Sequence, residues 1–481
     1  MISVFLREQK RYTKKELIHK LILINENDVN ILKRLKEYGI LKTVRNTPVQ
    51  MDLSDLLEED IEITTVENDS VDYYYVFTFV GVLAINGRIL KCFPKYIKNN
   101  KSPRNELKQI LRVLEKYNKK EQIIQLQSSN SDGKTFNSLS VMLFLINDYH
   151  HNGSYSSTHQ ITEVNGTGEI LWDKTINETF TLISQNRPFY PELLTKRSIN
   201  NEQDYFKRLY DAIITKCSND LETADLLDLF DILAADITDE AIEDFGEVDY
   251  ILDRISKELN VQFNTHKQLI LKTMYSYIAN GTSLDDTSTL NMYGTNSFNL
   301  VWEEICSEIF ENKLKSSLDL LAPIIGTHPD YKHTLRLVDL IEKPLWTSGD
   351  FEKTAKKTLI PDSISIVEIN SKIHFIIFDA KYYNFQLIKD KLSGYPGIES
   401  ITKQYLYQLA YKKFTMDFGI DTVKNCFLFP SEDEIDFNGN VSMQIIDELG
   451  LEKIQVRLLF APFVYDYYLN NKKFDISLLN L

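Results

Sequence analysis

Cysteine is scarce in this sequence, and the few cysteines are isolated. Only four occur in 481 residues, and none forms a Cys-x-x-Cys pair or lies near histidines at zinc-ligand spacing. This pattern excludes the common structural zinc sites. Free cysteines are usually small buried hydrophobic residues, so we expect all four to be buried: Cys92, Cys217, Cys306 and Cys426.

Long apolar runs are also absent. No stretch reaches the roughly 18 apolar residues that could span a bilayer. Charged residues such as Arg7 and Lys10 interrupt residues 1–12 before a signal-like apolar segment develops. We therefore expect a cytoplasmic protein without a membrane partner.

Positive charge is in deficit, because the formal net charge is −15. This argues against a protein that coats DNA through its overall field, although it leaves local contacts possible. Residues 220–253 carry many acidic side chains and no basic one, whereas basic side chains predominate in residues 91–120. Both patterns are typical of solvated helix faces. We also formulate the hypothesis that residues 91–120 contact DNA or a partner.

The length of 481 residues is too great for one typical hydrophobic core. With 43% hydrophobic and 26% charged residues, the composition is that of a globular protein. We predict a multi-domain α/β protein with three parts: a β-rich N-terminal domain at 1–160, a central segment and acidic helical region at 161–285, and a C-terminal domain at 286–481.

A hairpin signal marks the N-terminal part. Asn86 and Gly87 separate apolar runs at residues 73–85 and 88–96, and both residue types accept the positive φ of a type I′ turn. Residues 105–117 and 139–149 have helical spacing of their apolar side chains. We therefore predict strands followed by helices.

Helical periodicity dominates residues 201–279, and residues 281–289 have the composition of a linker. The C-terminal part instead mixes both periods, which indicates a mixed sheet flanked by helices. We predict helices at 297–314 and 400–414, and strands at 364–369, 372–378, 425–429 and 454–461.

A second expected hairpin determines how two aspartates lie relative to each other. If Asn370 and Ser371 form its two-residue turn, Asp362 and Asp379 are cross-strand partners. Carboxylates at the roughly 5 Å Cβ separation of such partners repel each other unless a proton or a cation lies between them. A divalent metal fits this gap.

Lys381 lies on the same strand face as Asp379, because the side-chain period of a strand is two. An isolated Asp-x-Lys triplet is usually an exposed strand end. Here it follows a nearly continuous apolar run at residues 373–378, and charges at the end of a buried strand are costly without a function. With Mg²⁺, such a lysine can orient or activate water and offset the charge that develops on a phosphate.

A third acid is expected from the upstream helix. Leu300, Val301 and Ile305 define its apolar face, which Glu303 and Glu304 border. Either glutamate could reach the sheet, and solvated helix glutamates are the alternative.

Several motifs together resemble the nuclease subunits of McrBC-like restriction systems, and especially the LlaJI restriction endonuclease family. They are residues 294–303, Pro361 with Asp362, residues 379–382 and residues 405–411. Outside this part, residues 79–82 and 93–96 are similar to the N-terminal β-domain of McrC-type proteins, and residues 166–176, which include Trp172, Asp173 and Lys174, to their central segment.

The resemblance implies a PD-(D/E)xK endonuclease domain and assigns roles to five residues. Asp362, Asp379 and Glu303 would hold Mg²⁺, Lys381 would be the catalytic lysine, and Gln408 would be an auxiliary polar residue. McrC-type proteins often carry an acid three residues before this glutamine, but this chain has Tyr405 there. Such subunits work on double-stranded DNA with a McrB-like AAA+ GTPase or ATPase, which they stimulate. The resemblance therefore also implies that the N-terminal domain at 1–160 contacts this motor.

Alternatives to a nuclease subunit remain open. The fold could serve a non-catalytic assembly or specificity subunit that binds DNA and stimulates the motor, or a RecB-like exonuclease that degrades DNA from ends. Gly133, Lys134 and Thr135 resemble the end of a P-loop, but Ser128 replaces the glycine that the motif requires. The motor is therefore expected in another chain. His150 and His151 lack ligand neighbours and are expected at the surface.

Overall fold

The computed structural model describes most of the chain in separate stretches. These are residues 1–23, 26–45, 73–127, 137–156, 158–200, 204–280, 290–389, 391–444 and 449–481. Two polar segments of the sequence analysis lie outside the described residues. They are the loop that contains the P-loop-like residues Gly133, Lys134 and Thr135, and the expected linker at 281–289.

The chain forms two compact units. The central unit comprises residues 84–87 and 135–292 with Met1, and the terminal unit comprises residues 2–83, 88–134 and 293–481. Segments from both ends of the sequence thus belong to the terminal unit. The three-part division along the sequence stays a prediction.

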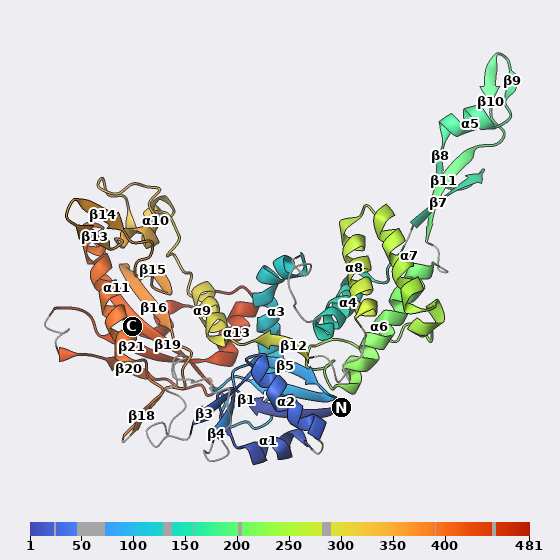
Figure 1. The fold of residues 1–481 in the computed structure, drawn as a ribbon. Helices are drawn as coiled ribbons and strands as arrows, with labels where there is room; N and C mark the ends of the chain where they lie inside the picture. Colours follow the sequence, from blue (N-terminus) through green and yellow to red (C-terminus); the bar gives the residue numbers. More distant parts are fainter. Residues whose placement is uncertain are drawn as a thin grey trace. The chain divides into compact units, whose positions relative to one another are not determined.

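Two small sheets are built around the N-terminal segments (Figure 1). The first has the order β1-β6-β5-β12, with β1 Ile2–Arg7, β5 Val80–Ile85, β6 Arg88–Phe93 and β12 Leu290–Thr295. The second has the order β2-β4-β3, with β2 Arg11–Tyr12, β3 Leu41–Arg45 and β4 Tyr73–Phe77. Asn86 and Gly87 have φ values of 47° and 67°, which confirms the predicted turn.

The apolar run at residues 73–85 forms two strands, not one. The chain leaves β4 at Thr78, whose backbone N–H donates to Ile40 O at 2.9 Å and whose hydroxyl donates to Gly39 O at 2.9 Å. Because these bonds anchor Thr78 to the loop before β3, β4 and β5 enter different sheets.

Three helices accompany these sheets: α1 Lys14–Leu21, α2 Glu26–Glu37 and α3 Arg104–Gln127. The predicted apolar face of α3 is confirmed, since Leu107, Ile110, Leu111 and Leu114 are buried. Some of the basic side chains nearby are not at the surface. Lys91 is fully buried beneath the Phe5 ring, and Lys116 donates to Glu308 Oε1 at 2.7 Å. The surface interpretation of residues 91–120 is therefore wrong for Lys91.

The central unit is largely helical, as predicted. Its helices are α4 Ser138–Asn152, α5 Trp172–Glu178, α6 Tyr205–Thr223, η3 Ile242–Phe245, α7 Val248–Val261 and α8 Thr265–Ala279. Its short strands were not predicted: β7 Thr158–Val164, β8 Glu169–Ile170, β9 Leu182–Ser184, β10 Arg187–Phe189 and β11 Leu194–Asn200.

Residues 224–241 are turns and irregular chain, although their apolar spacing predicted a helix. Side chains of α6 take the backbone donors of this segment. Ser218 accepts from Ala235 N at 2.9 Å, and Thr215 accepts from Ile237 N at 3.1 Å. Hydrogen bonding to a neighbouring helix therefore replaces the bonds of a helix of its own.

A five-stranded mixed sheet dominates the C-terminal part (Figure 1). Its order is β15-β16-β19-β21-β20, with β15 Ser363–Ile369, β16 Lys372–Ala380, β19 Thr422–Ser431, β20 Asn438–Val441 and β21 Ile454–Phe460. Pairing is parallel within β16-β19-β21 and antiparallel at both edges. The predicted strands are thus confirmed, and β20 was missed.

Helices and small hairpins surround this sheet. They are α9 Phe298–Ile309, α10 Leu318–Ile325, η4 Leu337–Leu340, α11 Ile398–Asp417, α13 Ala461–Leu469 and η5 Ile476–Leu479, with the hairpins β13 Leu345–Ser348 to β14 Phe351–Thr354 and β17 Gln386–Ile388 to β18 Lys391–Ser393. Helix α9 ends before the predicted residue 314. Leu300 is 48% exposed, so the prediction that it belongs to the apolar face is wrong.

Strand β16 is buried on both faces, as its apolar run predicts. On one face, Phe375 contacts Tyr411 of α11 with ring centroids 5.2 Å apart. On the other face, Phe378 stacks on Phe310 at 4.9 Å. Asp379 follows in the same alternation as Phe375 and Ile377, which places it on the α11 face at the end of this core.

Two further predictions concern the cysteines and membrane-spanning segments. All four cysteines are free and buried, as expected. Among the described residues, no helix combines the length and the apolar character needed to cross a membrane.

Candidate active site

The hairpin β15-β16 has the register that the sequence predicts. Ser363 pairs with Phe378 and Ile369 pairs with Lys372, around a turn in which Asn370 and Ser371 have φ values of 51° and 59°. Asp362 and Asp379 directly adjoin the last pair of this ladder, Asp362 just before β15 and Asp379 in β16. Asp362 Oδ2 accepts a hydrogen bond from Ala380 N at 3.2 Å, which fixes its carboxylate beside the end of β16.

Lys381 joins this pair as expected. Its Nζ lies 2.9 Å from Asp379 Oδ1, and its backbone N–H donates to Leu428 O of β19 at 2.9 Å. The Asp379 side chain is only 7% exposed, and its Oδ1 has two lone pairs, of which the contact with Lys381 Nζ uses one. This oxygen therefore retains capacity for a ligand such as a cation.

The pKa of Asp362 shows how strongly the two carboxylates affect each other. Burial, a hydrogen bond to Asp379 and repulsion by Asp379 and Glu303 raise the pKa of Asp362 to about 9, and Lys381 offsets only part of this increase. Without a cation, the pair of Asp362 and Asp379 thus keeps a proton at neutral pH. A bound cation would replace that proton.

Lys381 keeps its charge in the same environment. Burial lowers the pKa of its ammonium group, but attraction to Asp379, a hydrogen bond to Asp379 and attraction to Asp362 together raise it above the ordinary value. The side chain is therefore an ammonium ion at neutral pH. It can hold a phosphate or water by hydrogen bonding, and it is not a base.

Glu303 is the helix acid that faces this cluster. Burial raises its pKa, attraction to Lys381 lowers it, and repulsion by Asp379 raises it again, with a net increase. Trp302, its neighbour on α9, donates from Nε1 to Leu428 O at 3.2 Å, the same carbonyl that accepts from Lys381 N. Helix α9 and Lys381 thus share one backbone anchor.

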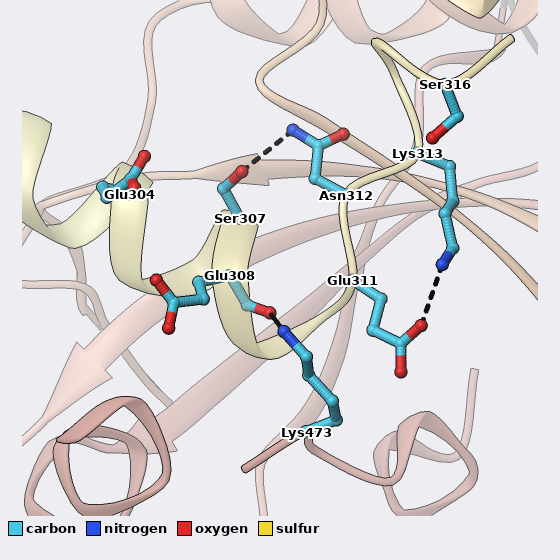
Figure 2. Close-up of a pocket in the computed structure, with 8 residues that line it drawn as sticks. All are labelled: Glu304, Ser307, Glu308, Glu311, Asn312, Lys313, Ser316 and Lys473. Carbon is cyan, nitrogen blue, oxygen red and sulfur yellow. Dashed lines mark hydrogen bonds and ion pairs between the residues drawn. The ribbon is translucent and has the colours of Figure 1, made fainter. Parts of the chain in front are cut away.

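Glu304 lies elsewhere on α9. It borders an open hollow between α9, the loop that follows it and the segment that carries Lys473 (Figure 2). The lining residues are Glu304, Ser307, Glu308, Glu311, Asn312, Lys313, Ser316 and Lys473. One residue of this hollow also contacts the backbone around Asp362. Asn312 Nδ2 donates to Asp362 O at 3.1 Å, and Asn312 Oδ1 accepts from Ile364 N at 3.1 Å. Asn312 therefore fixes the backbone that carries Asp362.

A metal centre of three close protein ligands is not formed. Among the described residues, no group of three or more His, Cys, Asp or Glu side chains is arranged to hold a metal ion. Mg²⁺, however, is commonly held by one or two carboxylates, with water and substrate phosphates as the remaining ligands. The facing aspartates and the buried oxygen of Asp379 fit this ion, with Glu303 nearby.

Two glutamines of α11 contact the sheet, and the role predicted for Gln408 stays a prediction. Gln408 Oε1 accepts from Asn425 Nδ2 on β19 at 2.9 Å, so its described contact is to the sheet. Gln404, one turn earlier, is fully buried and donates to Ile377 O, two residues before Asp379, at 2.9 Å. Gln404 Oε1 has no hydrogen-bond partner in the described chain. The sequence offers both glutamines on one helix face and does not distinguish them.

The other marked residues lie in the central unit. His150 and His151 are exposed and contact the backbone oxygens of Leu233 and Asn147, as expected for surface histidines. Trp172 begins α5 and is 52% exposed.

Comparison with known proteins places this geometry in a family. The family model of the LlaJI restriction endonuclease matches residues 79–323 and 328–461, which is more than half of the chain. The chain belongs to the LlaJI restriction endonuclease family. The first matched segment contains Glu303, and the second contains Asp362, Asp379 and Lys381.

Individual proteins also match this LlaJI-family chain, at sequence identities below 30%. It is 28% identical over 408 residues to the Type II restriction enzyme BsuMI component YdjA of Bacillus subtilis (strain 168), covering 83% of this chain and 82% of that protein. A solved assembly of Thermococcus gammatolerans McrB AAA+ hexamers with bound McrC matches with 13% identity and a TM-score of 0.37, covering 98% of this chain and 99% of that one. A second structure, the McrBC complex of the same organism, matches with 13% identity and a TM-score of 0.27 over 63% and 86% of the two chains.

Proposed function

We propose that this chain is the DNA-cleaving subunit of an NTP-dependent restriction system, and that it hydrolyses phosphodiester bonds of duplex DNA at a Mg²⁺-dependent, PD-(D/E)xK-type centre. The observation that carries this proposal is the pair of Asp362 and Asp379 at the end of a buried hairpin, with Lys381 Nζ 2.9 Å from Asp379. Membership of a restriction endonuclease family supports the reaction class.

The metal would be held by Asp362 and Asp379, with Glu303 close to the same charges. When bound, Mg²⁺ polarises a phosphoryl oxygen and lowers the pKa of its water ligand. The side chains of Asp362 and Lys381 would supply the other functions of the centre. Asp362 gives up the proton that its raised pKa keeps in the metal-free protein. Lys381 remains an ammonium ion and stabilises negative charge on the scissile phosphate.

The AAA+ partner belongs to the same proposal. The Bacillus subtilis relative is named as a component of a restriction enzyme, which supports a multi-subunit system. The P-loop-like sequence lacks its first glycine, so we assign NTP hydrolysis to a McrB-like GTPase or ATPase in another chain. Exposed apolar side chains of the central unit, such as Phe180 at 70% and Ile183 at 76%, are of the kind that partner proteins cover.

One observation favours a second function. The alternative is a non-catalytic assembly or specificity subunit that binds DNA and stimulates the motor, a role that needs no group of three metal-ligating side chains, and the described residues hold no such group. Both functions require the same fold, but only the nuclease requires Asp379 and Lys381.

Cleavage of closed circular duplex DNA separates these functions. The assay contains the AAA+ partner, nucleotide and Mg²⁺, with wild-type protein, Asp379→Ala or Lys381→Ala. A nuclease subunit cuts the circle, and either substitution lowers the rate by at least about a hundredfold. Wild-type rates in both variants would exclude this active site, and digestion restricted to linear DNA would indicate an exonuclease.

A further inference from the structure

Tyr382, the residue after Lys381, is bound to the opposite end of the sequence. Its side chain is buried, and its hydroxyl donates a hydrogen bond to Glu8 Oε2 across a separation of 374 residues. Glu8 directly follows β1 and is only 5% exposed. A buried carboxylate is costly unless it accepts hydrogen bonds, so this contact constrains both residues.

The position of Glu8 is fixed by strand β6. Glu8 N donates to Phe93 O at 2.9 Å, and Lys95 N donates to Glu8 Oε2 at 3.2 Å. The same carboxylate oxygen thus accepts from Lys95 and from Tyr382. Residues 93–96, which the sequence marks as a motif without assigning them a role, provide the anchor for Tyr382.

Lys95 encloses Tyr382 from a second direction. Its Nζ lies 4.6 Å from the centroid of the Tyr382 ring, within the range of a cation–π interaction, and donates to Gln9 Oε1 at 2.9 Å. Its carbonyl accepts from Asn384 Nδ2 at 3.2 Å. Lys95 therefore contacts both Tyr382 and Asn384, the residues on either side of position 383.

The same tyrosine contacts the helix that carries Glu303. Its ring lies 5.3 Å from the ring of Phe298, the first residue of α9, and 6.4 Å from Tyr96 in an edge-on arrangement. Tyr96 shares a 2.8 Å hydrogen bond with the hydroxyl of Tyr465. The ring of Tyr465 in turn meets Trp302, the neighbour of Glu303, at 6.3 Å.

We propose that Glu8 and Lys95 are positioning residues for the nuclease centre: through Tyr382 they set the placement of Lys381 and of the α9 acid. The proposal rests on the nuclease function proposed above. It means that the N-terminal segment completes an active site whose charged residues all lie beyond residue 300. A partner that shifts β1 or β6 would change the position of Lys381 and thereby the rate of cleavage.

The test removes the hydroxyl contact from either side in the full-length chain. Tyr382→Phe keeps the ring, and Glu8→Gln keeps the shape of the side chain. Single-turnover cleavage of closed circular DNA is measured with partner, nucleotide and Mg²⁺. Because a displacement of about 1 Å can reduce a rate by about a hundredfold, we expect each variant to lose roughly tenfold to a hundredfold in maximal rate. The DNA concentration for half-maximal rate should not change.

The double variant and a matched control separate positioning from general destabilisation. If Glu8 acts through Tyr382, the double variant is no slower than the slower single variant. Tyr411→Phe is the control, because it also removes a buried hydroxyl bond, to Leu337 O at 3.0 Å, within the core beneath α11. It should cleave at the wild-type rate. All rates are taken at a temperature at which thermal unfolding shows every variant to be folded.

The outcomes for the inference and for the proposed function differ. Wild-type cleavage by Tyr382→Phe, together with loss of cleavage by Asp379→Ala, would refute the positioning role and leave the nuclease function intact. Multiplicative losses in the double variant would also refute it. Cleavage by Asp379→Ala at the wild-type rate would instead refute the nuclease function. If Tyr382→Phe does not fold, Glu8→Gln and Lys95→Met provide the same comparison of rate with half-saturation.

Discussion

The shared proton of the aspartate pair makes a measurable prediction about stability. Burial and the neighbouring Asp379 raise the pKa of Asp362 to about 9 in the metal-free protein, whereas an unfolded chain has an aspartate pKa of about 3.9. Between these pH values the unfolded chain releases a proton that the folded chain keeps. Stability therefore falls as pH rises from the lower value to the higher one. Replacing Asp362 with asparagine removes this dependence.

The size of the effect follows from proton linkage. Each pH unit between the two pKa values reduces the free energy of unfolding by about 1.4 kcal/mol for one proton. From pH 5 to pH 8 the loss reaches about 4 kcal/mol, which is an upper bound because Asp379 shares the titration. Mg²⁺ should reverse the trend, since it binds the deprotonated pair.

Urea unfolding followed by circular dichroism at both pH values, in EDTA, measures this dependence. Relative to the wild type, Asp362→Asn should gain up to about 4 kcal/mol in the free energy of unfolding between pH 5 and pH 8. Asp339→Asn is the control, because a hydrogen bond from Arg336 lowers the pKa of Asp339. Asp339 therefore causes no loss of stability between pH 5 and pH 8. Parallel pH curves for the wild type and Asp362→Asn would refute the shared proton.

Three further predictions follow from individual contacts. Glu303→Gln should reduce the cleavage rate by roughly tenfold or more, whereas Glu304→Gln should not, and equal effects in the same circular-DNA assay would contradict the assignment of Glu303. Gln404→Leu leaves Ile377 O without its donor and should lower the free energy of unfolding by about 1–3 kcal/mol, measured by urea unfolding; an unchanged value would show that this bond contributes nothing. Ser371→Gly should raise that free energy by about 1 kcal/mol, because Ser371 has a φ of 59°, and a decrease would argue against the turn.

The sequence predicts the β15-β16 hairpin well because its geometry is local. A two-residue turn at Asn370 and Ser371 determines every pair in the ladder, so the relation of Asp362 to Asp379 needs no information from distant residues. The identity of Lys381 as the third member follows from strand alternation alone. The buried run of β16 supports the same register.

The parts that the sequence does not predict depend on long-range contacts. The contact of Glu8 with Tyr382 joins residues 374 positions apart, and no periodicity reports such a pair. The choice between Gln404 and Gln408 depends on which carbonyl and amide groups of the sheet lie beneath each turn of α11. Residues 224–241 lose their expected helix because Ser218 and Thr215 accept hydrogen bonds from their backbone.

The most direct test of the central claim is the rate at which closed circular DNA is cut by Asp379→Asn, compared with Asp339→Asn, at saturating Mg²⁺ with the AAA+ partner and nucleotide. Both substitutions replace a carboxylate with an amide, but only Asp379 faces Asp362 and Lys381. The account predicts that Asp379→Asn loses at least about a hundredfold in rate and that Asp339→Asn cuts like the wild type. Wild-type cutting by Asp379→Asn would contradict the account.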